Sequence, residues 1–308
     1  MTIGKPLVSV IIPTYNDGKF IFDAVMSVKE QTYRPIEIII IDSSDVDSIR
    51  DFAVSSDDIT YLVEPPNGPS AARNAGLDVC TGEIIAFLDA DDIWLPTKLE
   101  RQVDIISSGV GFVYSDTLVE GDGGHRHYLS TLSVHDPQNH YVRYFRRGGI
   151  PCCTVAISRD CLKGRRFDTG FLTVEDRHLW VRLLRTCSVQ RIPKALTVYR
   201  RRANSATSNV NKLFEDEMNV IDDLTRRYPE LEPFRNEVEA IAEYKRGKRL
   251  LRQNERFRAI AAITRGIRLN WWELRFYFLL FLALVPLPTS TSIRYLERAV
   301  MIVRRRIS

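Results

Sequence analysis

Three of the four residues from 89 to 92 are aspartates, and they directly follow a short apolar run, 83–88, with the composition of a buried strand. Like charges this close raise each other's pKa, so Asp89 and Asp91 are costly to ionise without a compensating cation. Their oxygen ligands suit Mg²⁺ or Mn²⁺, and such an ion could bridge the carboxylates to a diphosphate. Asp92 could instead cap the helix expected after it.

Arg73 follows Asn67-Gly68-Pro69-Ser70, at the start of a helix expected over 71–79. With Ser70 as its N-cap, the N-terminus of this helix would favour a phosphate, and a guanidinium fork adds a cation suited to it. The alternative is a solvated surface arginine.

Glu175 and Asp176 open another expected helix, 174–184. First-turn acids favour the helix dipole, so simple capping is one interpretation. The sharper one makes Asp176 a general base that deprotonates an acceptor hydroxyl. The cationic run 199–202 could clamp a diphosphate or form a solvated basic turn.

Elements of regular structure must bring these groups together. Uninterrupted apolar runs separated by helical patterns favour a parallel sheet covered on both faces, whose ligands bind beyond the carboxyl ends of the strands. The expected strands of this first part are 7–12, 36–41, 60–64 and 83–88, and the expected helices are 19–31 and 71–79. Further on we expect a helix at 96–107, strands at 112–114, 154–158 and 196–199, a loop at 120–128, and helices beyond Asn211. Asp42 ends the second strand, where it could accept hydrogen bonds from a base or ribose, or form a turn with the serines that follow.

Five segments in this order, 8–16, 38–42, 68–76, 87–92 and 175–180, make the chain resemble the family 2 glycosyltransferases over roughly residues 7–202. The resemblance implies the α/β GT-A fold, a Rossmann-like mixed sheet flanked by helices. It also implies an inverting transfer of a sugar from a nucleotide diphosphate sugar to an acceptor hydroxyl, with Mn²⁺ or Mg²⁺ as cofactor.

The resemblance also implies roles for individual residues. Asp91 would ligate the metal, Asp176 would be the catalytic base, and Glu175 would shape the acceptor site beside it. The donor-binding residues would be Pro13, Thr14, Tyr15, Asp42, Arg73, Asp89 and Arg202.

The chain departs from the family pattern at two places. Ser43 and Ser44 follow Asp42 where many relatives carry a second acid and then Gly-Ser, which weakens the nucleoside assignment. Arg202 stands where many relatives carry a histidine. Arginine cannot ligate a cation, so Arg202 is assigned to phosphate at most.

Charge is distributed unevenly along the 308 residues. Residues 240–308 hold 15 Lys and Arg against 4 Asp and Glu, whereas residues 1–239 hold 28 against 35. With 44% hydrophobic residues, global disorder is excluded. We expect a catalytic domain over 1–205 and a helical C-terminal region over 206–308.

The segment 271–288 begins with Trp271-Trp272 and holds the most apolar run of the chain, which falls short of the ~20 residues that a spanning helix needs. Paired tryptophans and basic flanks favour a helix lying in the cytosolic leaflet, so we expect the chain at the cytoplasmic face of the cell membrane. A helix buried against the catalytic domain is the alternative. Membrane contact would suit a lipid-linked acceptor.

The five cysteines are odd in number, and none shows metal-ligand spacing. We therefore expect reduced thiols in a cytosolic compartment, with neither a disulfide framework nor a zinc site. The N-terminus has no charged and then apolar leader, so a secretory signal is not expected.

Three other functions compete with the glycosyltransferase. The basic tail could serve a non-enzymatic membrane- or nucleic-acid-binding protein. Its basic residues are interleaved with apolar ones, so no nucleic-acid partner is expected. A nucleotidyl- or phospho-transfer enzyme and an inactive scaffold of the same fold are the other two.

Overall fold

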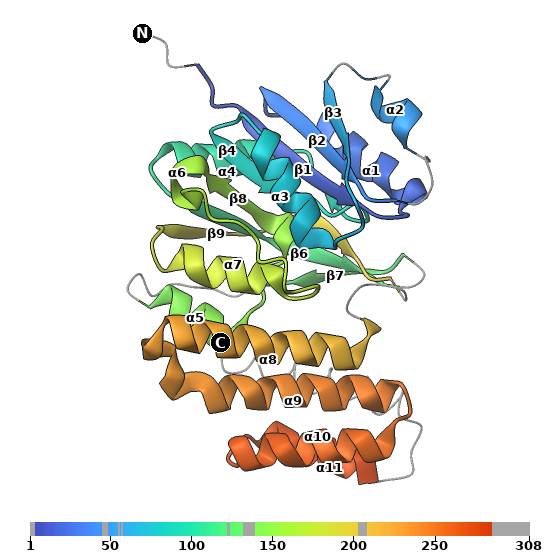
Figure 1. Cartoon of the computed structure of the whole chain (residues 1–308), viewed down its shortest axis with the longest axis vertical. Coiled ribbons are helices and arrows are strands. Elements are labelled where there is room, and N and C mark those ends of the chain that lie inside the picture. Colours follow the sequence, from blue (N-terminus) through green and yellow to red (C-terminus); the bar gives the residue numbers. More distant parts are fainter. Residues whose placement is uncertain are drawn as a thin grey trace. The chain divides into compact units, whose positions relative to one another are not determined.

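A computed structural model describes residues 4–44, 49–54, 56, 58–121, 124–131, 139–202 and 208–284 (Figure 1). They fall into two compact units, Met1–Ser205 and Ala206–Ser308.

The first unit contains one mixed sheet with the strand order β3-β2-β1-β4-β8-β6-β9-β5, and β7 pairs with β6. The strands are β1 (Val8–Thr14), β2 (Ile36–Asp42), β3 (Ile59–Val63), β4 (Ile84–Phe87), β5 (Ile93–Trp94), β6 (Phe112–Glu120), β7 (Arg126–Leu129), β8 (Val155–Ser158) and β9 (Val189–Arg200). The helices are α1 (Gly18–Lys29), α2 (Arg50–Val54), α3 (Pro69–Val79), α4 (Lys98–Ser107), α5 (His140–Arg147), α6 (Arg159–Leu162) and α7 (Glu175–Leu184), with a 3₁₀ turn η1 (Cys152–Thr154).

The first four strands are parallel to one another, as their apolar runs predict. Val8 pairs with Ile36 on one side and with Ile84 on the other, so β1 lies at the centre of this half. Beyond β4 the sheet turns antiparallel, because β8 pairs with β4 and β6 in the opposite direction. This mixed sheet flanked by helices confirms the predicted fold class.

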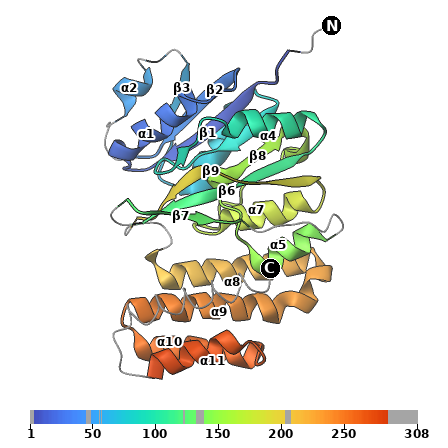
Figure 2. The same ribbon diagram turned by 180° about the vertical axis from the view of Figure 1, so that it is seen from behind.

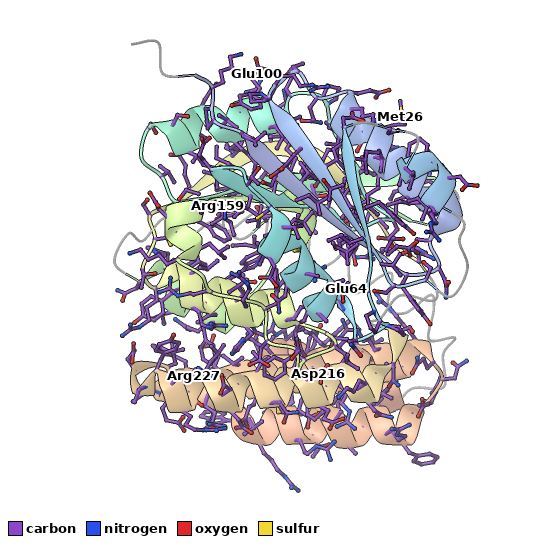
Figure 3. All side chains as sticks on the ribbon, turned by 45° about the horizontal axis from the view of Figure 1, so that its top comes forward. Met26, Glu64, Glu100, Arg159, Asp216 and Arg227 are labelled. Atoms are coloured by element: carbon purple, nitrogen blue, oxygen red, sulfur yellow. A yellow bond between two sulfur atoms is a disulfide. The ribbon has the colours of Figure 1, made fainter. Side chains whose placement is uncertain are left out.

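Helices cover both faces of the sheet (Figure 2), and side chains lie between the helices and the strands (Figure 3). On one face, β1 and β4 share a core with α1 and α4. On the other, Trp180 of α7 packs edge-on against Phe112 and Phe167. Helix α3 approaches the same face so closely that a Cβ at Gly76 would stand 2.5 Å from Ile11, so only glycine fits there.

The prediction misses several elements in the middle of the chain. The expected loop 120–128 instead contains the last residue of β6 and most of β7. All four residues of β7 are exposed, so the strand shows no apolar alternation that a sequence pattern could detect. The short helices α5 and α6 were also not expected.

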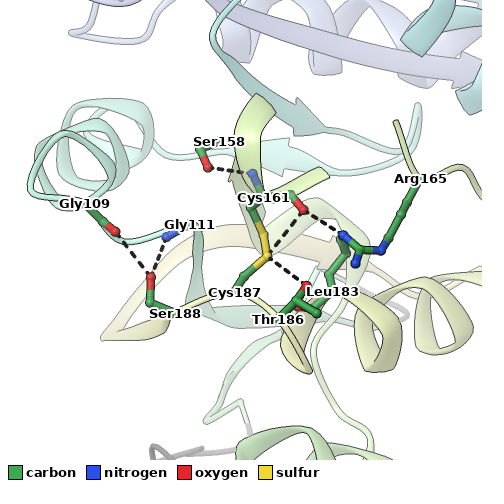
Figure 4. Close-up of a disulfide and its surroundings, with 9 residues drawn as sticks. All are labelled: Gly109, Gly111, Ser158, Cys161, Arg165, Leu183, Thr186, Cys187 and Ser188. Atoms are coloured by element: carbon green, nitrogen blue, oxygen red, sulfur yellow. Dashed lines mark hydrogen bonds between the residues drawn. A yellow bond between two sulfur atoms is a disulfide. The ribbon is translucent and has the colours of Figure 1, made fainter. Parts of the chain in front are cut away.

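The cysteine prediction is wrong, because Cys161 and Cys187 form a disulfide with their Cα atoms 5.6 Å apart (Figure 4). Cys161 lies in α6 and Cys187 follows α7, so the fold brings together residues 26 positions apart. An odd count and an adjacent pair at 152–153 conceal this pairing in the sequence. Cys80, Cys152 and Cys153 are free and buried.

The second unit is helical. Its elements are α8 (Val210–Arg227), a 3₁₀ turn η3 (Pro229–Phe234), α9 (Arg235–Arg252), α10 (Arg256–Leu269) and α11 (Leu274–Leu284). Successive helices pack on one another, and their core includes Leu250, Ile263 and Phe276. The ring of Phe276 fills the space beside Gly266, where a Cβ would stand 2.1 Å from it.

Helix α11 has apolar residues on two faces. Phe276, Leu279, Leu282 and Ala283 are buried in the core of the unit. Leu274, Tyr277, Phe278, Phe281 and Leu284 are 44–80% exposed, as are Trp271 and Trp272 just before the helix. Among the described residues, no helix combines the length and apolarity needed to cross a membrane. Residues 285–288 of the predicted membrane segment lie outside the described residues, as do the arginines that follow.

Candidate active site

The carboxyl ends of β1, β2 and β4 bring five of the expected donor-binding residues to one edge of the sheet: Pro13, Thr14, Tyr15, Asp42 and Asp89. Thr14 pairs with Asp42 in the register of β1 and β2, and Asp89 comes two residues after β4 ends. Asp42 is buried, and it accepts hydrogen bonds from the Ser44 amide (2.9 Å) and the Tyr61 hydroxyl (2.8 Å). Tyr15 is 53% exposed at the end of β1, next to Pro13 and Thr14, where its ring can meet a ligand.

The acidic residues 89–92, here called the acid loop, are held at both ends. The Leu88 amide donates to Ile11 at 3.1 Å, which fixes the entry from β4. At the exit, Ile93 of β5 pairs with Val198 of β9. The acid loop is therefore fixed next to the end of β9.

Two cap predictions are wrong. Asp92 does not cap α4, which begins at Lys98 with Thr97 as its N-cap. Asp92 is fully buried and accepts a 3.0 Å hydrogen bond from the Arg200 amide, and burial raises the pKa of its carboxyl well above the usual value. Ser70 does not cap α3, because that helix begins at Pro69 with Gly68 as its N-cap.

Arg73 joins two parts of the site. Its guanidinium donates 2.6 Å hydrogen bonds to Asp89 in the acid loop and to Glu175 at the start of α7. Arg73 is 4% exposed, and Phe167 lies against it with its ring centroid 5.3 Å away. A charge buried this deeply needs such partners. Both terminal nitrogens are occupied by carboxylates, so the expected contact of Arg73 with a phosphate stays a prediction.

Glu175 and Asp176 enter the site from a constrained turn. Val174, just before them, has φ of 57° in the left-handed region, which is uncommon for a β-branched residue. Burial and the neighbouring Glu175 charge raise the pKa of Asp176 to about 7. Tyr144 of α5 is buried close enough for the Asp176 charge to add to the rise in the pKa of its phenol. Asp176 therefore has the proton affinity of a general base near neutral pH.

Asp91 faces a cation from this chain. Arg202 contacts Asp91 at 3.4 Å and donates a shorter bond to Asp17 at the start of α1, and the ring of Phe20 lies 4.7 Å from the guanidinium. Burial and the charges of Asp89 and Asp17 raise the pKa of Asp91 to about 6. A cavity of about 370 Å³ opens here, lined by Phe20, Asp23, Glu120, Gly121 and Arg200, Arg201 and Arg202.

The ligand atoms at Asp91 suit a divalent cation whose coordination is completed by oxygen atoms of the substrate. No group of three or more His, Cys, Asp or Glu side chains within the described ranges is arranged to hold a metal. Mg²⁺, however, keeps several waters and is bound through one or two carboxylates plus substrate phosphates. Burial and the neighbouring carboxylates disfavour the charged form of Asp91, and a bound cation would favour it.

A buried lysine supports the exit of the acid loop. Lys98 is fully buried, donates to Gln102 at 2.6 Å and stands 3.9 Å from the ring centroid of Trp94. Burial lowers the pKa of its amine to about 7. The Trp94 indole in turn donates to the Cys153 carbonyl at 2.9 Å, so β5 is tied to η1.

Three residues near the charged groups escape the sequence analysis. Asp17 follows the end of β1 by three residues, a position that could have singled it out, but Asn16-Asp17-Gly18 also has the composition of a turn. Tyr144 and Cys152 carry no such signal. Cys152 is buried within reach of the charges of Arg73, Asp89 and Asp176, and burial raises the pKa of its thiol.

Comparison with known proteins adds an independent observation. A family model described as glycosyl transferase family 2 matches residues 9–168. The Escherichia coli protein named UDP-Glc:α-D-GlcNAc-diphosphoundecaprenol β-1,3-glucosyltransferase WfaP is 32% identical over 220 residues, which cover 70% of this chain and 85% of that protein. WfgD of Escherichia coli, which has the same descriptive name, is 30% identical over 223 residues, covering 70% and 86%.

Solved structures share the fold at low sequence identity. TarS 1–349 of S. aureus, in complex with UDP, aligns with a TM-score of 0.60 and 16% identity over 89% of this chain and 82% of that one. The mannosyltransferase PcManGT of Pyrobaculum calidifontis, in complex with GDP-Man and Mn²⁺, aligns with a TM-score of 0.61 and 19% identity, covering 97% and 81%.

Proposed function

Because the chain belongs to glycosyl transferase family 2, it is a glycosyltransferase of the GT-A fold, and we propose that it transfers a sugar with inversion from a nucleotide diphosphate sugar to an acceptor hydroxyl. The observation that carries the proposal is the Arg73 bridge between Asp89 and Glu175. It joins the acid loop, which we assign to the donor side, to the acidic start of α7 through one side chain.

The donor is proposed to bind at the carboxyl edge of β1, β2 and β4. Pro13, Thr14 and Tyr15 would line the nucleoside with Asp42, and Asp89 would lie near the ribose. Arg202 would contact the diphosphate, because one of its faces lies on Phe20 and it borders the cavity. Arg73 would act on the donor by holding Asp89.

We assign the cofactor, Mn²⁺ or Mg²⁺, to Asp91. When bound, it would neutralise the charge that develops on the leaving diphosphate. The PcManGT complex, which holds Mn²⁺ with GDP-Man on the same fold, supports a divalent cation as the cofactor.

The chemistry needs one base and one displacement. The carboxylate of Asp176 would take the proton of the acceptor hydroxyl as that oxygen forms its bond to the anomeric carbon. The bond from this carbon to the diphosphate breaks in the same step, and the nucleoside diphosphate leaves. Glu175, fixed by Arg73, would shape the acceptor side.

The acceptor is proposed to be a sugar on a lipid diphosphate. The names of WfaP and WfgD give GlcNAc-diphosphoundecaprenol as their acceptor, and the chain aligns with 85% and 86% of their lengths. An acceptor of this class is anchored in a membrane, so the enzyme would work at a membrane surface.

We place that contact, at the cytoplasmic face of the membrane, on the outer face of α11. Trp271 and Trp272 are 65% and 68% exposed. The outer face of α11 adds further exposed apolar residues, namely Leu274, Tyr277, Phe278, Phe281 and Leu284. Indole rings favour the boundary between headgroups and acyl chains.

The variant Trp271→Ser/Trp272→Ser should bind vesicles containing anionic phospholipid at least about tenfold more weakly than the wild type, because the loss of each ring removes a large apolar area that the membrane would bury. Phe257→Ser, at an even more exposed ring on α10, is the matched control. Equal flotation of all three proteins would exclude this surface.

The donor assignment can be tested by thermal unfolding with a panel of nucleotide sugars and Mn²⁺. A donor that binds the folded state raises the unfolding temperature. We expect a shift with a UDP- or GDP-sugar that is lost in Asp91→Asn. No shift with any nucleotide sugar would contradict the proposal.

A further inference from the structure

Asp17 is the acid of the site to which no sequence motif assigns a role. Its backbone carbonyl accepts bonds from the amides of Phe20 (2.7 Å) and Ile21 (3.2 Å), as an N-cap carbonyl does. Its side chain makes no capping hydrogen bond to α1. The carboxylate instead accepts a short, charge-assisted bond from Arg202. The side chain of Asp17 therefore acts on Arg202 and not on its own helix.

The two carboxylates share Arg202 unequally. The same terminal nitrogen of Arg202 that is bonded to Asp17 stands 3.4 Å from Asp91, which is long for a charge-assisted hydrogen bond. Phe20 lies against the guanidinium and limits its movement on that side. While Arg202 is bonded to Asp17, it contacts Asp91 without forming a close ion pair with that carboxylate.

We propose that Asp17 is a positioning residue that holds Arg202 beside Asp91, and so keeps the Asp91 carboxylate available to a divalent cation. The proposal rests on the proposed function, in which Asp91 holds that cation. Without the charge of Asp17, Arg202 closes on Asp91 and forms the tighter pair that arginine and carboxylate prefer. A cation arriving at Asp91 must then displace the guanidinium.

Two simpler roles would also make Asp17 matter for cation binding. Its negative charge could attract the cation through space, or its oxygen could ligate the ion directly. Neither of them depends on Arg202. A role through Arg202 does, and a double-mutant cycle separates the two cases because it measures the interaction between the two side chains.

The experiment measures binding of Mn²⁺ alone, without nucleotide, from the electron paramagnetic resonance signal of the free ion. Millimolar Mn²⁺ is used, because the substrate oxygens that complete the site are absent. The proteins are the wild type, Asp17→Asn, Arg202→Gln and the double variant. We expect Asp17→Asn to weaken binding about tenfold in the presence of Arg202, and less than about twofold in the Arg202→Gln background. Arg202→Gln alone should bind Mn²⁺ at least as tightly as the wild type.

Asp23 provides a matched control. Asp23 lies on α1, the helix that follows Asp17, and it pairs at 2.9 Å with Arg200, which is two residues before Arg202. No contact joins Asp23 to Asp91 in the described structure. Asp23→Asn should leave the Mn²⁺ affinity within about twofold of the wild type, since only a distant exposed charge is lost. The Asp17 side chain makes no capping hydrogen bond to α1, so Asp17→Asn should remain folded, as thermal unfolding will check.

Equal losses on Asp17→Asn in both backgrounds would overturn the proposal, as would no loss in either. Absence of Mn²⁺ binding by both the wild type and Arg202→Gln would overturn it too. Asp91→Asn separates this result from the proposed function. If Asp91→Asn still binds Mn²⁺ like the wild type, the cation site itself is wrong. If that variant loses the ion and the cycle shows no coupling, only the role of Asp17 is wrong.

Discussion

Arg73 donates a 2.6 Å hydrogen bond to Glu175, a residue 102 positions further along the chain and adjacent to Asp176. The other terminal nitrogen of the same guanidinium holds Asp89. One buried cation therefore fixes the acid loop and the start of α7 relative to each other. Catalysis of a displacement depends on such fixed geometry, because orientation supplies much of the rate enhancement.

Removal of Arg73 should destabilise the protein as well as impair it. Arg73→Gln leaves Asp89 and Glu175 without their shared cation, and breaking a buried ion pair costs about 3–5 kcal/mol in the free energy of unfolding. Urea unfolding followed by circular dichroism measures this. Arg166 provides the matched control, since it pairs with Asp78 at the surface, where the side chains are 39% and 65% exposed. Arg166→Gln should cost less than about 1 kcal/mol. Similar costs for the two variants would show that the Arg73 bridge adds nothing.

Turnover should depend on the ionisation of Asp176. The pKa of this carboxyl is raised to about 7, and a general base must be deprotonated, so activity should rise with pH around a midpoint near 7 and fall away toward pH 5. The positive charge of Arg73 favours the carboxylate form, hence Arg73→Gln should move the midpoint to higher pH. A profile that is flat from pH 5 to 8 would argue against Asp176 as the base.

Lys98 should make the stability of the fold depend on pH. Burial lowers the pKa of this amine from 10.5 to about 7, so between these values the unfolded chain binds the proton and the folded chain does not. Stability should therefore rise with pH from about 7 to 10, by on the order of 1 kcal/mol per pH unit. Lys98→Met removes the titrating group, and its unfolding free energy should lack this slope. The same slope in both proteins would place its origin elsewhere.

The disulfide should be detectable by counting thiols. Denatured, unreduced protein should react with Ellman's reagent at three cysteines, Cys80, Cys152 and Cys153. Reduction should make Cys161 and Cys187 reactive as well. It should also lower the free energy of unfolding by about 3 kcal/mol, because the unfolded chain regains the conformational entropy that a closed loop of this length removes. Five reactive thiols before reduction would show that the bond does not form.

Local patterns predict much of the first half of the fold. The apolar runs before Pro13 and Asp42 and before the acid loop become β1, β2 and β4, because a strand buried on both faces leaves a continuous apolar run. Strand β7 carries only exposed residues and pairs with β6, which directly precedes it. The first part of β9 also carries exposed residues, and it pairs with β6 from far away in the sequence. No local pattern contains such a partner.

In the candidate site too, some features can be predicted from the sequence and others cannot. Acids at strand ends, such as Asp89 and Asp91, can be selected because topology brings strand ends together. The partners of these acids cannot. Three contacts of the site join residues 16 or more positions apart. Arg73 binds Asp89, Asp17 binds Arg202, and Asp92 accepts a hydrogen bond from the Arg200 amide. They depend on packing of side chains that no spacing encodes.

The most direct test of the account is the turnover of Asp176→Asn, measured as nucleotide release from a UDP- or GDP-sugar with Mn²⁺ and a polyprenyl diphosphate-linked sugar as acceptor. The amide retains the size of the side chain but cannot accept the proton, so turnover should fall by about 10²- to 10⁴-fold. Thermal stabilisation by the donor should remain, because Asp176 is placed on the acceptor side. Wild-type turnover in a folded Asp176→Asn protein would contradict the account.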